Sequence, residues 1–335
     1  MPLPATPITW SGCLTGQRSP FPCSPVPTGG GQGLHSRGNF EGYVRAASPR
    51  KWLEVHGLEH WTEFYTPYGV TLQKRFFDYF LKGVESGWPD QPSVLLQVRT
   101  VDGFVERREK EWPLARTQWT RFYLDPANRH LTRDPVVTEG CVEYEPIGEG
   151  VTFITEQFET ETEITGPAAA KMFVASSTTD ADLFLVMRLF DPDGGEVLFT
   201  GATDLFIPLT QSWLRASHRK LDPELSTEYC PYHTHDELQP LTPGEVYGLD
   251  VEVWPTSIVI PPGYRLGLTI RGSDYENAGD GEKRMFLGKE IKGSGPFWHD
   301  EPRDRPLEIF GERVSVHAGG TKNSYLLLPV VPEQA

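Results

Sequence analysis

The segment Asp182-Leu-Phe-Leu-Val-Met-Arg-Leu-Phe190 decides the fold class of this chain. Its side chains are apolar on both faces except for Arg188, which is typical of a central strand that is covered on both sides. Two other runs, residues 245–254 and 264–271, alternate apolar with polar residues, so each is expected to bury one face of a sheet. The sequence therefore predicts a sandwich of β-strands.

More strand candidates lie upstream, bounded by Gly, Pro, Asp or Asn. They are residues 93–99, 119–124 and 170–176. The 33 Gly and 30 Pro residues are spread as turn punctuation between short apolar runs, and this pattern favours many short strands over long helices. We therefore expect a mainly β protein, with a jelly-roll β-sandwich as a single domain over residues 89–335.

The net charge and the cysteine content indicate which partners the protein can bind and in which cellular compartment it lies. The 335 residues carry 31 basic and 46 acidic side chains, a net charge of -15, which repels nucleic acid and anionic membrane surfaces. No stretch reaches the roughly 20 apolar residues of a membrane span, and the first 28 residues do not resemble a secretory signal. The four cysteines form no C-x-x-C pair, which favours a reducing compartment and predicts a cytoplasmic protein without nucleic-acid or membrane partners.

The region before the strands has a different character. Residues 1–28 are rich in Pro, Ser and Gly without apolar periodicity, so they are expected to be disordered or foreign to the fold. From Gly29 onward, a Gly-rich loop, a short helix at about 39–47 and a short strand at 51–55 form an α/β pattern. Residues 29–88 are therefore predicted to be a separate α/β segment.

A second helix is indicated after Thr66-Pro67, because Thr is a good N-cap and Pro suits the first helical turn. Lys82-Gly83 ends it, with Gly at the usual stop position. The apolar residues between these signals make a single stripe along one helical face; they are Leu72, Phe76, Phe77, Phe80 and Leu81. The pattern predicts an amphipathic helix.

The chain was searched for a catalytic serine. The elbow that presents such a serine reads G-x-S-x-G, and this motif does not occur in the 335 residues. The nearest approach surrounds Ser36 in the run Leu34-His-Ser-Arg-Gly38, which has Gly on one side only, so Ser36 is interpreted as an ordinary loop residue. Glu41 is a candidate for the acid of a triad, with a solvated surface glutamate as the alternative.

His60 has the features of a catalytic base. It follows the short apolar strand, lies in a loop after Gly57 and is flanked by Trp61, Phe64 and Tyr65. A histidine after a late strand occupies the last place in the Ser, Asp, His order of α/β-hydrolases. The alternative is a packed loop histidine that donates to a backbone carbonyl.

The run Cys230-Pro-Tyr-His-Thr-His-Asp236 was considered as a metal site, because an H-x-H pair with nearby Cys and carboxylates can bind zinc, iron or nickel. A jelly-roll metal site of the cupin type also needs a further histidine on a later strand, and Ile260–Leu266 supplies none. A polar surface loop without metal is therefore the expectation here.

Several runs together resemble a known family. The stretch KWLEVHGLEHWTEFYTPYGVTLQKRFFDYFLKG (Lys51–Gly83) resembles the end of the catalytic domain of CocE/NonD hydrolases, which include cocaine esterase and X-prolyl dipeptidyl aminopeptidases. Shorter runs downstream are similar to the C-terminal jelly roll of that family, and they occur in the family order. These runs are Glu111–Pro113, Phe122–Asp125, Ile164–Pro167, Asp191–Gly194, Pro262–Leu266 and Ser324–Pro329.

This resemblance implies a serine hydrolase of acyl esters or X-Pro peptides that uses a Ser-His-Asp triad and no cofactor or metal. His60 matches the triad histidine, whereas the serine and most of the α/β-hydrolase sheet correspond to sequence upstream of anything present here. The resemblance thus implies that residues 29–88 are the end of an α/β-hydrolase domain, followed by a galactose-binding-like jelly roll. It also implies a truncated chain with little or no activity of its own.

Two further expectations follow from that interpretation. Loss of the α/β partner should expose an apolar face around Leu72, Phe76 and Phe80, so we expect self-association through this surface. The competing class is a non-catalytic β-sandwich that binds a ligand or a partner. In that case exposed aromatic residues such as Trp213, Trp254 and Trp298 would supply stacking platforms, although core or inter-domain packing is their commoner role.

Overall fold

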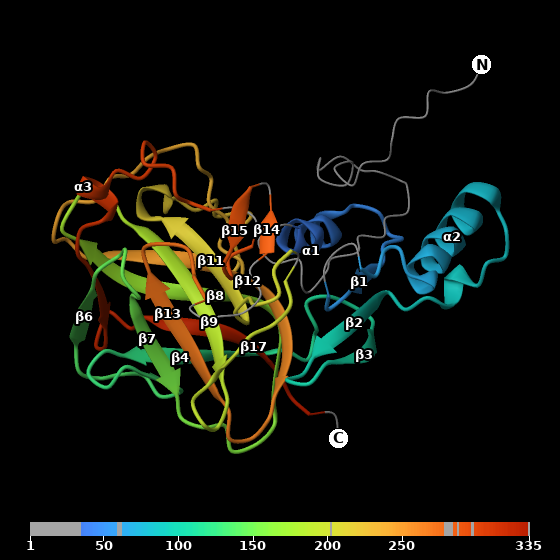
Figure 1. Cartoon of the computed structure of the whole chain (residues 1–335), viewed down its shortest axis with the longest axis horizontal. Coiled ribbons are helices and arrows are strands. Elements are labelled where there is room, and N and C mark those ends of the chain that lie inside the picture. Colours follow the sequence, from blue (N-terminus) through green and yellow to red (C-terminus); the bar gives the residue numbers. More distant parts are fainter. Residues whose placement is uncertain are drawn as a thin grey trace.

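A computed structural model describes residues 35–58, 62–201, 203–277, 284–286, 288–295 and 298–333. Strands dominate this part of the chain, and nearly all of them join one large sheet (Figure 1). The prediction of a mainly β protein is confirmed. None of the helices in the described ranges combines the length and hydropathy that a membrane crossing requires.

The helical elements are α1 (Ser36–Arg45), α2 (Pro67–Lys82), η2 (Trp88–Asp90), η3 (Ala216–His218) and α3 (Leu307–Phe310). The strands are β1 (Leu53–Val55), β2 (Val94–Arg99), β3 (Phe104–Glu109), β4 (Gln118–Asp125), β5 (His130–Thr132), β6 (Gly140–Tyr144), β7 (Val151–Thr155), β8 (Thr162–Ser176), β9 (Asp182–Phe190), β10 (Glu196–Val197), β11 (Thr210–Arg215), β12 (Tyr247–Ile260), β13 (Arg265–Arg271), β14 (Arg284–Phe286), β15 (Lys289–Ile291), β16 (Val314–Ala318) and β17 (Tyr325–Val331).

The main sheet follows the path β1-β2-β12-β8-β17-β4-β5-β7-β13-β9-β10, with β11 paired to β9. Strand β9 has β13 on one side and β10 and β11 on the other. Its residues Leu183, Leu185, Met187 and Leu189 are completely buried, and Arg188 is ion-paired on the opposite face. The prediction of a central strand at Asp182–Phe190 is confirmed, with the bounds that the sequence indicated.

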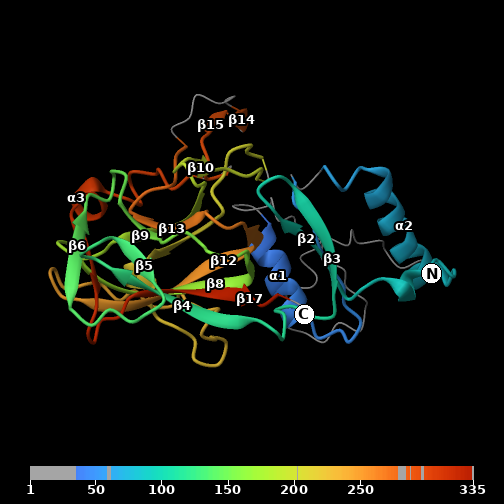
Figure 2. The ribbon, with the colours of Figure 1, turned by 90° about the horizontal axis from the view of Figure 1, so that it is seen from below.

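The sheet folds around one apolar core because its distant strands return to each other. The Thr210 hydroxyl of β11 donates to the Trp254 carbonyl of β12 at 2.9 Å, although the path separates these strands widely. Side chains from both ends, such as Leu185 and Leu249, belong to the same core cluster. We call residues 118–331 the β-domain; it forms the larger end of the molecule (Figure 2).

Two strands are longer than the sequence indicated. Strand β12 continues through Pro255, a residue that usually ends a strand. It does so because the register shifts by a bulge between Val253 and Thr256, which removes the proline from the hydrogen-bond ladder. Its partner β8 likewise runs through Gly166 and Pro167.

Residues 36–112 form a smaller unit, here called the α/β segment. Strand β1 pairs in parallel with β2, β3 pairs antiparallel with β2, and a single bridge from Arg99 to Ile258 joins β2 to β12. A separate apolar cluster lies under α1 and includes Phe40, Leu53 and Trp112. Figure 1 shows α1 beside the β-domain and α2 at the outer end.

Helix α2 has the bounds that its sequence signals predict. The Thr66 hydroxyl accepts a hydrogen bond from the Gly69 N–H at 3.1 Å, and Pro67 occupies the first helical turn. Gly83 ends the helix with φ of 66°, a conformation that a glycine adopts without steric cost. The predicted helix is confirmed.

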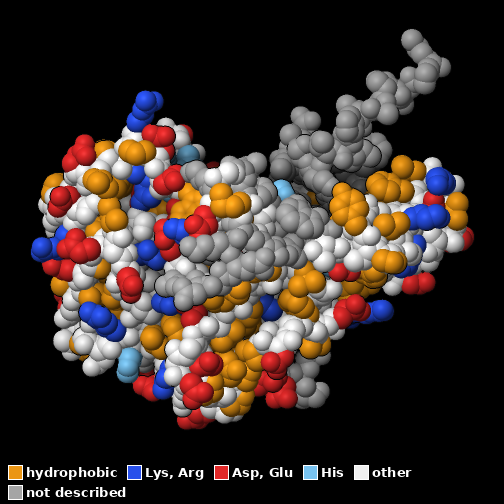
Figure 3. Space-filling model, viewed as in Figure 1, with side chains coloured by type: hydrophobic (Ala, Val, Ile, Leu, Met, Phe, Trp, Pro, Cys, Tyr) orange, Lys and Arg blue, Asp and Glu red, His pale blue; other side chains and the backbone are white. Residues whose placement is uncertain are grey.

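The expected exposure is contradicted for Leu72, whereas Phe76 and Phe80 are half-buried. Leu72 is buried, and the rings of Phe76 and Phe80 contact Trp88, which is only 1 % exposed. The chain after α2 therefore turns back and covers this face with η2, a packing that helical periodicity alone does not reveal. Phe77 and Leu81, which the sequence placed in the same apolar stripe, are exposed, and so is Val70. Apolar side chains are visible over this end in Figure 3.

Candidate functional site

His60, the predicted catalytic histidine, lies outside the described residues together with Glu59 and Trp61. The chain around it is described up to Leu58 and again from Thr62. Strand β1 leads into this loop, and the capped N-terminus of α2 follows it. The structure therefore defines what surrounds both ends of the loop, and the role of His60 itself stays a prediction.

A buried polar cluster connects the two ends of the loop. The Tyr68 hydroxyl, in the first turn of α2, donates to Oε1 of Glu54 on β1 at 2.6 Å. His56 Nε2 lies 3.4 Å from the same oxygen. Glu54 and His56 are 3 % and 4 % exposed, and within the described part of the chain His56 Nδ1 has no hydrogen-bond partner. The cluster thus connects the first turn of α2 to β1.

Burial shifts the pKa values of Glu54 and His56, the two ionisable groups beside the loop, in opposite directions. It raises the pKa of Glu54 to about 7, and the hydrogen bond from Tyr68 opposes this shift only in part. Burial lowers the pKa of His56 to about 4, because a low-dielectric interior disfavours the charged form of either group. At neutral pH His56 is therefore uncharged, and the carboxyl group of Glu54 is partly protonated. Such strongly shifted groups are common near functional sites.

The sequence pattern favoured Glu41 as the candidate acid, and Glu54 was not among the predicted site residues. One signal could have found it, since Glu54 and His56 are two residues apart on a strand and must share a face. The contact with Tyr68 could not be anticipated, because it depends on how α2 packs against β1. In place of Glu41 alone, the structure therefore offers a cluster in which Glu54 and His56 lie at β1 and Tyr68 lies on α2.

A small cavity adjoins the start of the loop. Gly57 and Phe104 line it from the α/β segment, and Pro255 and Ser257 line it from β12. Its volume of about 10 Å³ matches a single water molecule and is too small for a substrate. The Gly57 N–H donates to Oε1 of Gln97 at 2.9 Å, which anchors the loop at this point. The β-domain therefore borders the segment that carries His60.

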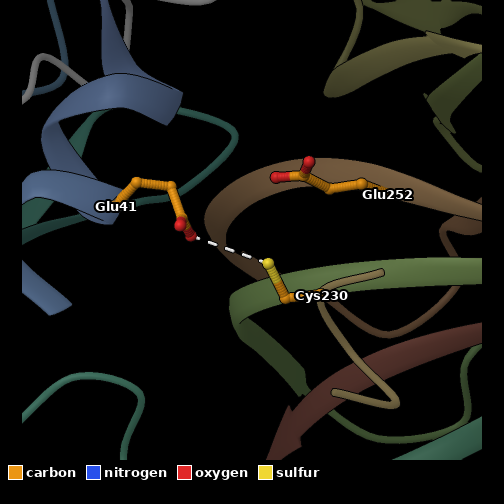
Figure 4. A group of neighbouring side chains, drawn as sticks. All are labelled: Glu41, Cys230 and Glu252. Atoms are coloured by element: carbon orange, nitrogen blue, oxygen red, sulfur yellow. Dashed lines mark hydrogen bonds between the residues drawn. The ribbon is translucent and has the colours of Figure 1, made fainter. Parts of the chain in front are cut away.

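Glu41 faces the β-domain. Its carboxylate forms an ion pair with Arg45 at 2.6 Å, and it accepts a hydrogen bond from the Cys230 thiol at 3.6 Å. Figure 4 shows that Glu41 points from α1 toward Cys230, with Glu252 of β12 close by. Ligand atoms of these three residues lie within 4.8 Å of one another, so the cluster was tested as a metal site.

The chemistry of this cluster does not suit a metal ion. The Arg37 guanidinium already contacts both carboxylate oxygens of Glu252, at 2.9 and 2.8 Å from Nε, and Arg45 compensates Glu41. Burial, with the two carboxylates adding to it, raises the pKa of the Cys230 thiol to about 12, whereas a cysteine binds metal as the thiolate. We interpret the cluster as the contact that holds α1 against the β-domain.

Ser36 and the tryptophans are also placed by the structure. Ser36 is buried in the first turn of α1, which agrees with an ordinary structural residue. Trp213 and Trp254 are half-buried, and their rings contact each other with centroids 4.7 Å apart. Trp298 is half-buried as well. Trp213 also packs against His299, with 4.4 Å between ring centroids, so packing accounts for much of the surface of this pair.

Comparison with known proteins now adds to the geometry. Residues 86–285 match the model of the X-Pro dipeptidyl-peptidase C-terminal non-catalytic domain. The chain belongs to this family. A CocE/NonD family hydrolase from Staphylococcus aureus has a similar structure, with a TM-score of 0.82 and 28 % identity, and the match covers 92 % of this chain and 54 % of that one. The protein is accordingly a member of the CocE/NonD hydrolases, as the sequence motifs predicted.

Two curated relatives agree with this assignment. A putative serine esterase of Mycobacterium bovis is 27 % identical over 238 residues, which are 60 % of this chain and 35 % of that protein. The cocaine esterase of Rhodococcus sp. is 25 % identical over 302 residues, 78 % of this chain and 46 % of the esterase. This CocE/NonD chain thus spans about a third to a half of the length of the curated relatives that it matches.

Proposed function

We propose that this protein contributes to the hydrolysis of acyl esters by a Ser-His-acid mechanism in which His60 is the general base. The observation that carries the proposal is the position of its loop. The loop follows β1, its ends are connected by Glu54 and Tyr68, and a cavity at its start is shared with β12 of the β-domain. A base held between a strand and a capped helix can meet a serine in a fixed geometry.

In such a mechanism the histidine removes the proton of a serine that attacks the ester carbonyl, and it later protonates the leaving alcohol. The 335 residues contain no G-x-S-x-G elbow, so we propose that this chain by itself has little activity. Removal of the serine in such enzymes costs about 10⁶-fold in turnover. The relatives named as esterases favour ester substrates, whereas the name of the matched domain family favours X-Pro peptides.

Assays on the purified 335-residue protein test this proposal. With p-nitrophenyl esters and Gly-Pro-p-nitroanilide we expect turnover close to that of buffer, and no labelling by a fluorophosphonate probe. His60→Ala should not change either result. Clear turnover that His60→Ala abolishes, with a labelled serine located by peptide mass spectrometry, would contradict the proposed absence of a nucleophile.

A second candidate function is a non-catalytic binding or interaction module. It is favoured by the match of residues 86–285 to a domain family described as non-catalytic. We propose domain limits of 1–28, 29–88 and 89–335, with a galactose-binding-like jelly roll as the last domain. In this division β2 and β3 belong to the last domain, although β2 pairs with β1 of the preceding one. The free thiols of Cys141 and Cys230 support a cytoplasmic location in this proposal. Saturable binding of a sugar or protein ligand with no role for His60 in any assay would favour the module.

A further inference from the structure

Three histidines of the β-domain meet in the long connection between β11 and β12. His218 ends η3, and its Nδ1 lies 3.0 Å from Nδ1 of His235. The rings of His235 and His233 are 6.0 Å apart between centroids. This cluster includes none of the residues that the proposed hydrolysis uses.

The fold holds this cluster in place through backbone hydrogen bonds. The Asp222 N–H donates to the Tyr232 carbonyl at 2.8 Å, the Thr234 N–H to the Lys220 carbonyl at 3.1 Å, and the Gln239 N–H to the Ser217 carbonyl at 2.8 Å. Residues 217–222 and 232–239 therefore run side by side. This pairing brings His218 to the H-x-H motif from the upstream side.

Downstream of the H-x-H motif, the run Ile260–Leu266 contains no histidine. In the structure the additional histidine comes from fifteen residues before the motif, because the connection folds back on itself. The connection thus brings the three imidazoles into one neighbourhood, in which His218 and His235 are in direct contact and His233 lies beside His235.

Two details of the cluster indicate a ligand. Two neutral imidazoles whose Nδ1 atoms face each other must share one proton, so either a hydrogen bond or a common ligand occupies this contact. The Nε2 atom of His233 is buried, and it has no hydrogen-bond partner among the described residues. A buried polar atom without a partner is unusual in a folded protein.

The separation of the Nδ1 atoms suits a shared metal ion. With bonds of about 2.0–2.1 Å, two imidazole ligands of a tetrahedral zinc ion lie about 3.3 Å apart, close to the observed 3.0 Å. The nearby cations are engaged elsewhere. Lys220 contacts Asp236 and Glu237 at 3.2 and 3.0 Å, and Arg37 contacts Glu252.

The backbone of His235 decides which substitution can test the cluster. Its φ is 54°, in the left-handed region where histidine, asparagine and aspartate are enriched among the residues other than glycine. Asparagine tolerates this backbone, so a variant is available that removes the imidazole without adding strain.

We propose that His218, His233 and His235 form a binding site for a divalent transition-metal ion such as Zn²⁺. Imidazole nitrogen is a preferred ligand of Zn²⁺, Ni²⁺ and Cu²⁺. His218 and His235 supply the facing Nδ1 atoms. His233 is the candidate third ligand, and its ring must turn toward the pair, because the nitrogens of the three residues do not all lie within 4.8 Å of one another. The site is independent of the hydrolase mechanism, so either proposal can fail without the other.

Calorimetric titration of ZnCl₂ into the full chain tests the site, with untagged protein that has been treated with EDTA. We expect one Zn²⁺ per chain. His235→Asn and His218→Ala should each weaken binding by about tenfold or more, and His233→Ala should weaken it to a smaller extent. His130→Ala is the matched control, because His130 is an exposed histidine beside Glu156, and it should bind like the wild type.

The alternatives give distinct results. Wild-type affinity in both His235→Asn and His218→Ala would overturn the proposal, and so would loss of binding on Cys230→Ser, which would assign the ion to the Glu41–Cys230–Glu252 cluster. No heat of binding at millimolar Zn²⁺ would mean that the two histidines share only a hydrogen bond. Thermal unfolding checks that each variant is folded, and the nitrogen hyperfine pattern of bound Cu²⁺ in the wild type tests imidazole ligation without any substitution.

Discussion

The β-domain and the α/β segment differ in how their buried ionisable side chains are paired. Asp182 of the β-domain is ion-paired with Arg215 and Arg305, whereas Glu54 of the α/β segment contacts His56 and Tyr68. In the β-domain, long strands such as β8, β9 and β12 enclose one apolar core. In the α/β segment a smaller apolar cluster lies beside the buried ionisable residues Glu54 and His56. Burial of the apolar core stabilises the fold. Burial of Glu54 and His56 lowers the stability, because ionisable groups are costly to remove from water. The strongly shifted pKa values of Glu54 and His56 therefore belong to the smaller unit, beside the loop that carries the proposed base.

The largest expected effects on stability come from substitutions that remove a buried side chain from one of the two apolar clusters. Phe153→Ala removes a completely buried ring from β7 and should lower the free energy of unfolding by about 3–5 kcal/mol. Leu53→Ala in β1 should cost about 2–4 kcal/mol, with hydrogen-exchange protection lost in residues 36–112 only. Equal loss of protection in the β-domain of the Leu53→Ala variant would show that the two units are one cooperative core.

The buried ionisable pair should give stability a characteristic pH dependence. Because the pKa of Glu54 is raised from 4.5 to about 7, the folded state keeps a proton that the unfolded chain releases, and stability falls as the pH rises through this window. The lowered pKa of His56, from 6.5 to about 4, makes stability rise between pH 4 and 6.5. Each contribution is on the order of 1–3 kcal/mol.

Urea unfolding at several pH values separates these contributions. Relative to the wild type, Glu54→Gln should become progressively more stable from pH 4.5 to 7. His56→Gln should become progressively less stable, relative to the wild type, from pH 4 to 6.5. Parallel pH profiles for the wild type and both variants would mean that the pair is not buried as described.

Gly57 tests how tightly the loop is held against β3. A Cβ atom at this position would lie 1.9 Å from the Phe104 ring, so Gly57→Ala must displace that ring. We expect a loss of about 1–3 kcal/mol, measured by chemical unfolding. The same change in a Phe104→Ala background should cost much less, and an equal cost in both backgrounds would place the strain elsewhere.

The smallest expected effect concerns the start of α2. Thr66→Ala removes the acceptor of the Gly69 N–H and should cost about 1 kcal/mol. Thr71→Ala is the matched control, because the Thr71 hydroxyl donates only to the Pro67 carbonyl on an exposed face of the helix. Similar thermal unfolding of the two variants would argue against a capping role.

The sequence predicted those elements whose signals are local. Thr66, Pro67 and Gly83 define α2, and apolar residues on both faces define β9. Strands such as β16 and β17 were not predicted individually, and β12 was interrupted at Pro255, because the bulge that accommodates this proline is a property of pairing with β8.

The candidate site, too, was predicted only as far as local sequence signals allow. The sequence identified the loop of His60 and its family, because strand, loop and helix follow one another in the chain. It could not identify the contact between Tyr68 and Glu54 or the approach of His218 to His235. Both contacts join separate segments, and their energies depend on the packed fold rather than on local sequence.

The central claim is that His60 is the base of a serine hydrolase whose loop is held by this fold. It is tested most directly by joining the upstream part of the Staphylococcus aureus CocE/NonD hydrolase, the 28 % identical structure, to this chain and measuring ester hydrolysis. We expect turnover well above buffer, reduced by His60→Ala about 10³-fold or more and unchanged by His130→Ala. A chimera that unfolds cooperatively and hydrolyses esters equally well with His60→Ala would contradict the account.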